Sequence, residues 1–572
     1  MANKFHLLNN STDDQQQNHN IPPRSIDDYL DTAYHHSCNT SSYTNGILHD
    51  LLQYWRYYII FLALGIANSG DSAEMGATNY ILSSETFQHD ILGGDNDGNE
   101  DVDFAKRGSA IAGAHFLGML ISGLLSGVLA DIVGRRKTLL LGLMGNTVVG
   151  VLSSLARNAI ELCILRFLCG INLGMVIAGV VTLTAEISPP SKRGRFMTLV
   201  ASCYTLGFLY TALWALLIFK MSDDGSSGSG SWRLFMFINA IPTMVATTLV
   251  TFFAPESPRF FLCRGRLKEA VHVSNQIASR IGYIDKPLTE EELRQYLYQA
   301  KGIGETSFRA KETIEVQNVD QTNSIREVWT SLLSIRQVFV KGYWRTTVPL
   351  QLTYFCLTLT TGVATWWTKI FQILQLQVDP YALSFYSTLS QIPGMMLASG
   401  LIDYFGRRRL VITGFSGGFI ALLLLSVTAN VIQITKDDPN VNYSWIILAA
   451  VCSHTVCLCI CWLGLDCLSA ESFPTRVRST GRGVCVATGR LAGFCVQFLY
   501  GSLVNQNRLS YMMSVASIFA IGGIIVSCKT TDTTNVDLRD HWDGKKDGSQ
   551  RRISLPKIRH SSKYSSCNEE IT

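Results

Sequence analysis

Charge is scarce in this sequence, and that scarcity excludes several classes of protein. Asp, Glu, Lys and Arg make up 16% of the 572 residues, and the formal net charge is only +4. The basic residues stand in short turns rather than in one patch, so we expect no nucleic-acid partner. The chain also lacks a Gly-x-x-x-x-Gly-Lys-Ser phosphate loop, so we expect no nucleotide as partner or energy source.

The cysteines give no sign of disulfides or of a metal site. Most of the 15 lie inside apolar runs, where a thiol behaves as a small hydrophobic group. In the run Cys457-Leu-Cys459-Ile-Cys461, the middle thiol would point away from the other two on a helix. We therefore predict no metal, no other cofactor and no enzyme active site. The polar first fifty residues show no cleavable signal peptide, so we expect the first span to direct insertion.

What the sequence does contain is long apolar segments. Hydrophobic residues make up 47% of the chain, and a run of about 20 of them is long enough to cross a bilayer. We predict an all-α, multi-pass membrane protein with twelve transmembrane helices in contact with the lipid bilayer. The expected spans are 55–82, 107–130, 138–156, 159–187, one that follows Arg195, one that begins at Trp232, 345–371, 381–402, 410–431, 443–470, 481–504 and 510–528.

Matching turns show that the chain contains an internal repeat. The basic turn at 127–137 has an acid, a glycine and two arginines at the same spacing as the turn at 400–409. A second pair of turns, 185–193 and 470–478, shares Ala, Glu, Pro and Arg in the same order. Repeats of this kind, found as two similar halves, are typical of secondary transporters.

On these residues the chain resembles the major facilitator superfamily, whose signature is a Gly-x-x-x-Asp-x-x-Gly-Arg-Arg-Lys turn between the second and third spans. The resemblance covers roughly Tyr54 to Cys528. The segment Pro255-Glu-Ser-Pro-Arg259 is similar to a motif of the sugar-porter and organic-ion branches. Two segments, 471–478 and 489–493, resemble the synaptic-vesicle-protein-related and organic-ion transporters. The resemblance implies a major-facilitator-type fold, in which two six-helix bundles move a solute by alternating access.

The charges of the short loops predict the orientation and the domain organisation. Excess Lys and Arg marks the cytoplasmic side of a membrane protein, so we expect both termini and the middle segment in the cytoplasm, at the plasma membrane or an internal membrane. Thr289 with Glu292, and Ser324 with Glu327, fit capping boxes that predict short helices in that segment. The expected domains are a disordered tail (1–53), an N-terminal bundle (54–254), a cytoplasmic linker (255–342), a C-terminal bundle (343–529) and a second tail (530–572).

Three polar residues in the first span are candidates for coupling. Asn68, Asp71 and Glu74 are three apart and therefore share one helical face. A charge within a span costs at least ~2.5 kcal/mol, so each should face a partner or a cavity. Arg166 enters the fourth span at a similar depth. We hypothesise that Asp71 or Glu74 binds the coupling proton or a cationic substrate under the control of Arg166, the alternative being a fixed ion pair.

In the second half, Asp466 and Arg490 lie in neighbouring spans. Arg490 could attract an anionic group or couple to Asp466, or the two could form a structural pair. His115 and His454 could transfer protons, although a buried histidine is more often simply hydrogen-bonded. Aromatic and hydroxyl residues at helical spacing predict a lined cavity, although packing is the simpler role for each alone. The predicted lining residues are Asn68, Tyr204, Thr361, Thr365, Trp366, Trp367, Ser384, Thr388 and Gln391.

The resemblance assigns the matched turns to a cytoplasmic gate that holds the outward-open state and breaks during transport. The implied contacts are Asp131 with Arg135, Asp403 with Arg407, Glu186 with Arg193, and Glu471 with Arg478. The same turns contain Gly127, Gly134, Arg136, Gly406 and Arg408. Alternatively, these residues serve only topology and turn geometry, which accounts for the arginines but not for acids at a fixed spacing.

The function predicted from the sequence is secondary active transport of a small polar or charged organic solute, coupled to protons. A hexose is not expected, because Gln351-Leu-Thr stands where sugar porters usually carry a Gln-Gln pair. Two alternatives stay open. The protein could be a sugar facilitator, or a non-transporting sensor or scaffold with a transporter fold.

Overall fold

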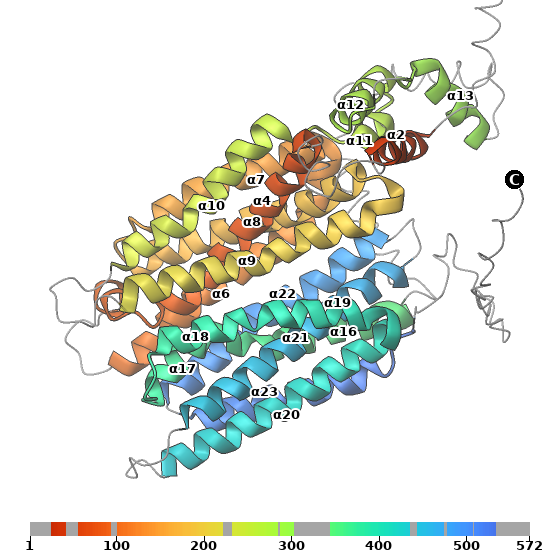
Figure 1. Ribbon diagram of the computed structural model, residues 1–572. Helices are drawn as coiled ribbons and strands as arrows, with labels where there is room; N and C mark the ends of the chain where they lie inside the picture. The colour runs from red at the N-terminus through yellow and green to blue at the C-terminus, as the bar shows by residue number, and fades with distance from the viewer. Residues whose placement is uncertain are drawn as a thin grey trace, which may run out of the picture.

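The computed structural model describes residues 25–41, 55–92, 100–220, 231–283, 286–301, 344–434, 443–473, 478–506 and 508–532. Every regular element in these ranges is a helix. Figure 1 shows two bundles of long, roughly parallel helices lying side by side, the first in orange and yellow and the second in green and blue.

The N-terminal bundle contains six long helices, of which α6 and α8 pack most closely. Its helices are α4 (Trp55–Ile81), α6 (Glu100–Val133), α7 (Arg135–Ser153), α8 (Ala159–Ile187), α9 (Arg193–Lys220) and α10 (Trp232–Phe253). Glycines of α8 allow this contact, since side chains or backbone of α6 leave no room for a Cβ at Gly170 or Gly174. A Cβ at Gly123 or Gly127, in contrast, would meet nothing within 4 Å among the described residues.

The C-terminal bundle repeats this arrangement with two interrupted helices. Its helices are α16 (Trp344–Thr361), α17 (Trp367–Ile373), α18 (Pro380–Leu389), α19 (Gln391–Phe405), α20 (Arg407–Ile434), α21 (Ser444–Ser472), α22 (Arg478–Asn505) and α23 (Leu509–Ser527). A 3₁₀ turn over Gly362–Trp366 joins α16 to α17. Pro393 follows the junction of α18 and α19 and cannot donate the backbone hydrogen bond that would continue the helix. When each interrupted pair is counted as one, the described chain has twelve long helices.

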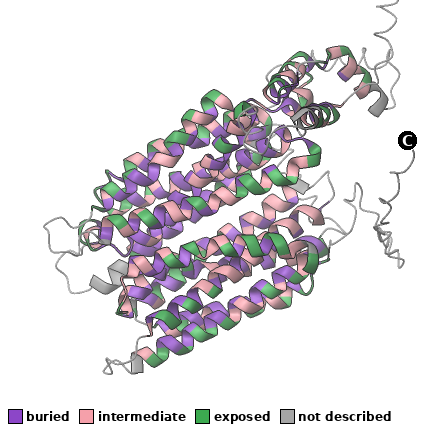
Figure 2. Cartoon of the chain, in the orientation of Figure 1, coloured by how far each residue is buried: buried purple, intermediate pink, exposed green. Residues whose placement is uncertain are grey.

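The surface of the bundles is as expected for a protein in a membrane. Eight described helices are long and apolar enough to cross one. Figure 2 shows exposed residues along the outer sides of both bundles and buried ones between the helices. Large apolar side chains are among the exposed ones, including Phe252 (74%), Ile420 (65%) and Leu155 (64%), which suits a surface that faces lipid. The predicted all-α fold of twelve helices in two bundles is confirmed.

Four shorter helices lie beyond one end of the N-terminal bundle (Figure 1): α2 (Ile26–Ser41), α11 (Pro258–Cys263), α12 (Leu267–Arg280) and α13 (Glu290–Lys301). The capping box at α13 is confirmed, because Glu292 N donates to Thr289 Oγ1 (3.3 Å) and Thr289 N to Glu292 Oε2 (3.0 Å). The second predicted box, at Ser324, lies outside the described residues, as does the tail beyond residue 532.

The prediction of a disordered tail is wrong for residues 26–41, which form α2. Ile26, Tyr29, Leu30 and Ala33 are at most 5% exposed and lie on one helical face. Ser25 begins the helix with a capping box of its own, accepting from Asp28 N (2.9 Å). The polar composition of the segment concealed an apolar stripe just wide enough to pack.

Candidate functional site

A buried charge cluster lies inside the N-terminal bundle. Glu74 of α4 and Arg166 of α8 are both 0% exposed, and Arg166 Nη1 donates to Glu74 Oε2 at 3.0 Å. Asp71, one turn earlier on α4, is also 0% exposed, and neither of its carboxylate oxygens has a hydrogen-bond partner among the described residues. The structure therefore joins Arg166 to one of the two predicted carboxylates and leaves the other unpaired.

The unpaired state of Asp71 has a chemical consequence. A carboxylate that is charged, buried and without a partner is strongly destabilised, whereas the neutral acid is tolerated. Two acids stand against one arginine in this cluster. The arrangement therefore fits one proton bound to the pair of acids, with Glu74 ionised against Arg166.

Residues of α7 and α8 complete this cluster, and the sequence analysis missed them. The Cys169 thiol of α8 donates to Asn146 Oδ1 of α7 at 3.0 Å. A Cβ at Gly150 of α7 would lie 2.6 Å from Glu74 Oε1, so only glycine leaves room for that carboxylate. Asn146 was the one signal in the sequence for these residues, because a polar amide stands there in the middle of an apolar span.

Asn68 and Tyr204 lie at the contact between α4 and α9. Asn68 Nδ2 donates to the Val200 carbonyl at 3.0 Å, which uses this amide to hold the two helices together. The Tyr204 hydroxyl donates to Met75 Sδ at 3.2 Å. Asn68 shares a face with Asp71 in the sequence, but the structure gives it a packing contact and not a contact with that carboxylate.

In the C-terminal bundle, Asp466 of α21 has a different partner from the one expected. Its Oδ1 accepts from Arg482 Nη2 of α22 at 3.3 Å and from the Tyr354 hydroxyl of α16 at 2.8 Å. Asp466 has no direct ion pair with Arg490, one of the alternatives left open, because Arg490 lies two helical turns further along α22. Tyr354 and Arg482 were not predicted, since antiparallel neighbours can be matched at several registers from sequence alone.

Arg490 lies between the two bundles. It interacts electrostatically with Tyr204 of the N-terminal bundle and with Asp466 and Tyr354 of the C-terminal one. Among the described residues it has no hydrogen-bond or ion-pair partner. His115 of α6, whose two ring nitrogens are also unpartnered, lies within electrostatic range of both Arg166 and Arg490.

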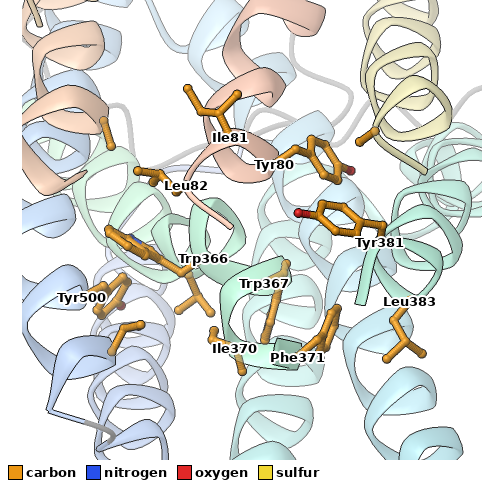
Figure 3. Close-up of a cluster of buried hydrophobic side chains, with 14 of the residues drawn as sticks. Tyr80, Ile81, Leu82, Trp366, Trp367, Ile370, Phe371, Tyr381, Leu383 and Tyr500 are labelled. Carbon is orange, nitrogen blue, oxygen red and sulfur yellow. The ribbon is translucent and has the colours of Figure 1, made fainter. Parts of the chain in front are cut away.

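The two bundles are joined at the end away from the arginine turns. Asn79 Oδ1 accepts from Thr368 Oγ1 (3.3 Å), Tyr80 and Thr388 share a hydrogen bond (3.5 Å), and Gln372 Nε2 donates to the Ser83 carbonyl (2.8 Å). The rings of Phe219 and Tyr381 stack with centroids 5.1 Å apart. Figure 3 shows Tyr80 and Tyr381 close together in this junction, above the pair Trp366 and Trp367.

Several residues that were predicted to line a cavity fill this junction. Trp366 is fully buried and donates from Nε1 to Gln497 (3.0 Å), and Trp367 packs edge-on against His454. Ser384 and Thr388 are also buried. Thr361 donates to the Thr358 carbonyl, Thr365 accepts from Gln497, and Gln391 begins α19. In this conformation the two tryptophans, Ser384 and Thr388 are packed, whereas the other three residues are only half-buried.

The opposite end of each bundle, which carries the arginine turns at 134–137 and 406–409, is called the basic end here. Gly134 and Gly406 have φ of 115° and 80°, which explains the glycine in each turn. Arg135 contacts Asp131 (2.9 Å) and Glu186 (3.4 Å), and Arg407 contacts Glu471 (3.2 Å). Arg136 and Arg408 donate to the carbonyls of Thr251 and Cys528.

The gate contacts agree with the expectation only in part. The Asp131–Arg135 contact is confirmed, but Glu186 pairs with Arg135 and not with Arg193, which instead contacts Asp27 of α2 (3.5 Å). The side chains of Asp403 and Arg478 lie outside the described residues. Glu256, in the Pro-Glu-Ser-Pro-Arg segment, was missed. Its Oε1 accepts from Arg136 N at 2.8 Å and so caps α7.

Close contacts of α6 with α22 are found in the half away from the arginine turns. A Cβ at Gly113 of α6 would touch Phe498 of α22 at 3.1 Å, and one at Gly501 of α22 would touch Trp366 at 3.1 Å, both in the half away from the arginine turns. In the basic half, Gly127 of α6 and Gly483 of α22 have nothing within 4 Å of an added Cβ among the described residues. The Asp131–Arg135 pair is intact in this conformation.

Comparison with known proteins agrees with this architecture. A family model described as "Sugar (and other) transporter" matches residues 59–541. The putative niacin/nicotinamide transporter NiaP of Bacillus subtilis is 22% identical over 491 residues, covering 83% of this chain and 97% of that protein. The putative transporter svop-1 of Caenorhabditis elegans is 24% identical, covering 72% of each chain.

A solved structure shows the same fold. The inward open conformation of the xylose transporter XylE from E. coli superposes with a TM-score of 0.59 at 16% identity, covering 84% of this chain and 98% of that one. The family model confirms the resemblance to the major facilitator superfamily that the sequence motifs indicated. The chain belongs to the sugar (and other) transporter family and is a multi-pass membrane transporter, not an enzyme.

Proposed function

We propose that this protein is a proton-coupled transporter that moves a small polar or charged organic solute by alternating access, with Asp71 as the proton-binding residue. The observation that carries the proposal is the fully buried Asp71 carboxyl, which has no partner beside the Glu74–Arg166 ion pair. A fixed structural pair needs one acid and one base. The second acid adds a site that can be charged or neutral, which is the property a coupled transporter requires.

The exchange of the proton follows from the charge balance. While Asp71 holds a proton, Glu74 and Arg166 neutralise each other. When Asp71 releases the proton, its negative charge competes with Glu74 for Arg166 from the same face of α4. Because α4 and α8 carry these groups, the change in pairing pulls on two helices of the N-terminal bundle. Protonation and the position of the bundle are thereby linked.

The solute would bind near Arg490, between the bundles. A guanidinium without a partner in this position attracts an anionic group, and it could hold a carboxylate with two hydrogen bonds. An organic acid carried with one proton would cross without net charge. The similarity to a putative niacin/nicotinamide transporter supports a small organic solute of this type. A sugar has no charge for Arg490 to neutralise.

The basic ends would face the cytoplasm, because Lys and Arg accumulate on that side of membrane proteins. The joined ends would then face outward, and the structure would represent an inward-facing state. Both described termini, α2 and the end of α23, would lie on the cytoplasmic side.

Two measurements test the role of Asp71. Purified protein in proteoliposomes should take up radiolabelled niacin faster under an inward-directed proton gradient, and Asp71→Asn should abolish that acceleration. Ser72→Ala, at a neighbouring buried residue whose hydroxyl bonds only within α4, is the matched control. Unchanged gradient-driven uptake in Asp71→Asn would refute the coupling. Uptake that ignores the gradient in the unmodified protein would favour a facilitator.

The second measurement needs no solute. An infrared difference spectrum between low and high pH should show the carbonyl band of a protonated carboxyl that is lost in Asp71→Asn and kept in Glu74→Gln. A band that is lost in Glu74→Gln but kept in Asp71→Asn would assign the proton to Glu74 instead.

A further inference from the structure

The helix α2, which precedes the first membrane-crossing helix, is docked on the basic end of the N-terminal bundle. Tyr29 packs edge-on against Tyr283 beyond α12, and Tyr34 packs edge-on against Phe196 of α9. Together with the four buried residues of its apolar stripe, these rings fix which face of α2 is turned to the protein. The polar face of α2 therefore lies against the turn between α8 and α9.

That polar face is acidic. Residues 26–41 contain three aspartates and neither lysine nor arginine. Asp27 Oδ2 accepts from Arg259 Nη2 at 2.5 Å, and its Oδ1 faces Arg193 Nη2 at 3.5 Å. Asp31 Oδ1 accepts from the backbone N–H of Ser191 at 3.1 Å. One helix thus holds the turn between α8 and α9 and the start of α11 together.

Asp27 also adds an acid to the gate region. Arg135 contacts the acids Asp131 and Glu186, whereas Arg193 and Arg259 both contact Asp27. Because Asp27 holds Arg193, Glu186 stays with Arg135, which explains why the expected Glu186–Arg193 contact is absent from the structure.

We propose that Asp27 is a positioning residue of the gate, whose contacts with Arg193 and Arg259 allow the two basic ends to approach each other. The proposal rests on the alternating access described above. The C-terminal bundle presents Arg407, Arg408 and Arg409 at its own basic end. Approach of the two bundles brings like charges together, and charges within about 10 Å repel through physiological salt. An acidic helix docked on one side lowers that repulsion.

The test measures how open the basic ends are, and it needs no substrate. A Cβ at Gly123 of α6 would meet nothing within 4 Å among the described residues, so a cysteine there has room to react, and we expect it to react with a water-soluble maleimide when the basic ends are apart. The full-length Gly123→Cys protein is compared with and without Asp27→Asn, after subtraction of labelling measured without the Gly123 change. We expect Asp27→Asn to raise the labelling rate about two- to fivefold, the range for two partly exposed ion pairs. The effect should shrink in high salt.

The controls separate the contact from the charge and from unfolding. Asp28→Asn removes the same charge from a residue that bonds Ser25 within the cap of α2, and it should leave the rate nearly unchanged. Asp27→Glu keeps the negative charge and should keep the original labelling rate. Equal rates for Asp27→Asn and Asp28→Asn, with α2 still protected from hydrogen exchange, would overturn the inference. That result would leave the role of Asp71 untouched, because its infrared band is measured independently.

Discussion

The two bundles carry their polar clusters in different surroundings. In the N-terminal bundle, Glu74 and Arg166 are fully buried beside an unpaired Asp71. In the C-terminal bundle, the side chains of Asp466 and Arg482 are 45% and 34% exposed, and Tyr354 supports the pair. The two bundles therefore share their helix arrangement but not the burial and pairing of their charged residues. The N-terminal cluster can change its charge only by gaining or losing a proton. The attraction between Asp466 and Arg482 is weakened by solvent, because both side chains are partly exposed.

The largest expected difference between the bundles is in stability. Arg166→Ala leaves Glu74 charged, buried and unpaired, which should destabilise the protein by about 3–5 kcal/mol. Arg482→Ala breaks a partly exposed pair and should cost no more than about 1 kcal/mol. Thermal or denaturant unfolding of the purified protein in detergent measures both. Equal losses would show that the two clusters are not electrostatically different.

A glycine pair extends the comparison to packing. Gly150→Ala places a Cβ 2.6 Å from Glu74 Oε1 and 3.1 Å from the Ala240 Cβ. We expect this crowding to lower the stability by about 1–3 kcal/mol. Gly483→Ala places a Cβ where nothing lies within 4 Å among the described residues, and it should be neutral or slightly stabilising, since alanine favours a helix. The same unfolding experiment compares them. A tolerated Gly150→Ala would mean that Glu74 can move freely.

A single hydroxyl tests the support of the C-terminal cluster. Tyr354→Phe keeps the buried ring but removes the donor to Asp466 and the contact with Ser469. We expect a loss of about 1–2 kcal/mol, because the hydrogen bond to a carboxylate is lost while Arg482 still balances the charge. Phe substitution at Tyr204, whose hydroxyl meets only the weak acceptor Met75 Sδ, is the control and should cost less.

The smallest expected effect concerns the gate turn. Asp131→Asn breaks an i,i+4 pair with Arg135 in which the aspartate is 67% exposed, and the stability should fall by no more than about 0.5 kcal/mol. Glu186→Gln, whose side chain is only 17% exposed, should cost more. Salt titration of the unfolding midpoint distinguishes the two, because screening weakens the exposed pair first. A larger loss for Asp131→Asn would indicate contacts beyond Arg135.

The sequence was informative where a pattern is local. The apolar spans and the two glycine turns follow from neighbours along the chain, and the structure has both. Arg166 was placed beside Asp71 and Glu74 because charges are rare inside spans and each must have a partner. The amphipathic stripe of α2 was equally local, and it was overlooked because the average composition of the segment is polar.

The contacts that the sequence did not predict depend on how helices distant in the chain align with each other. Asp466 had two arginines on α22 within plausible reach, and only the packing of α16, α21 and α22 selects Arg482. Gly150 has no chemical signal of its own, since its role is to leave space for the Glu74 carboxylate. Trp366 and Trp367 were expected at a cavity, but both are buried at the joined ends of the bundles.

The sequence by itself determined that this chain is a twelve-helix membrane protein built as a repeat, because apolar length and turn charge act on each segment separately. Only the tertiary structure decided which acid is paired, which is left without a partner, and that Asp27 contacts Arg193 and Arg259. These outcomes depend on distances of a few ångströms between helices, and such distances are set by how all the side chains pack together.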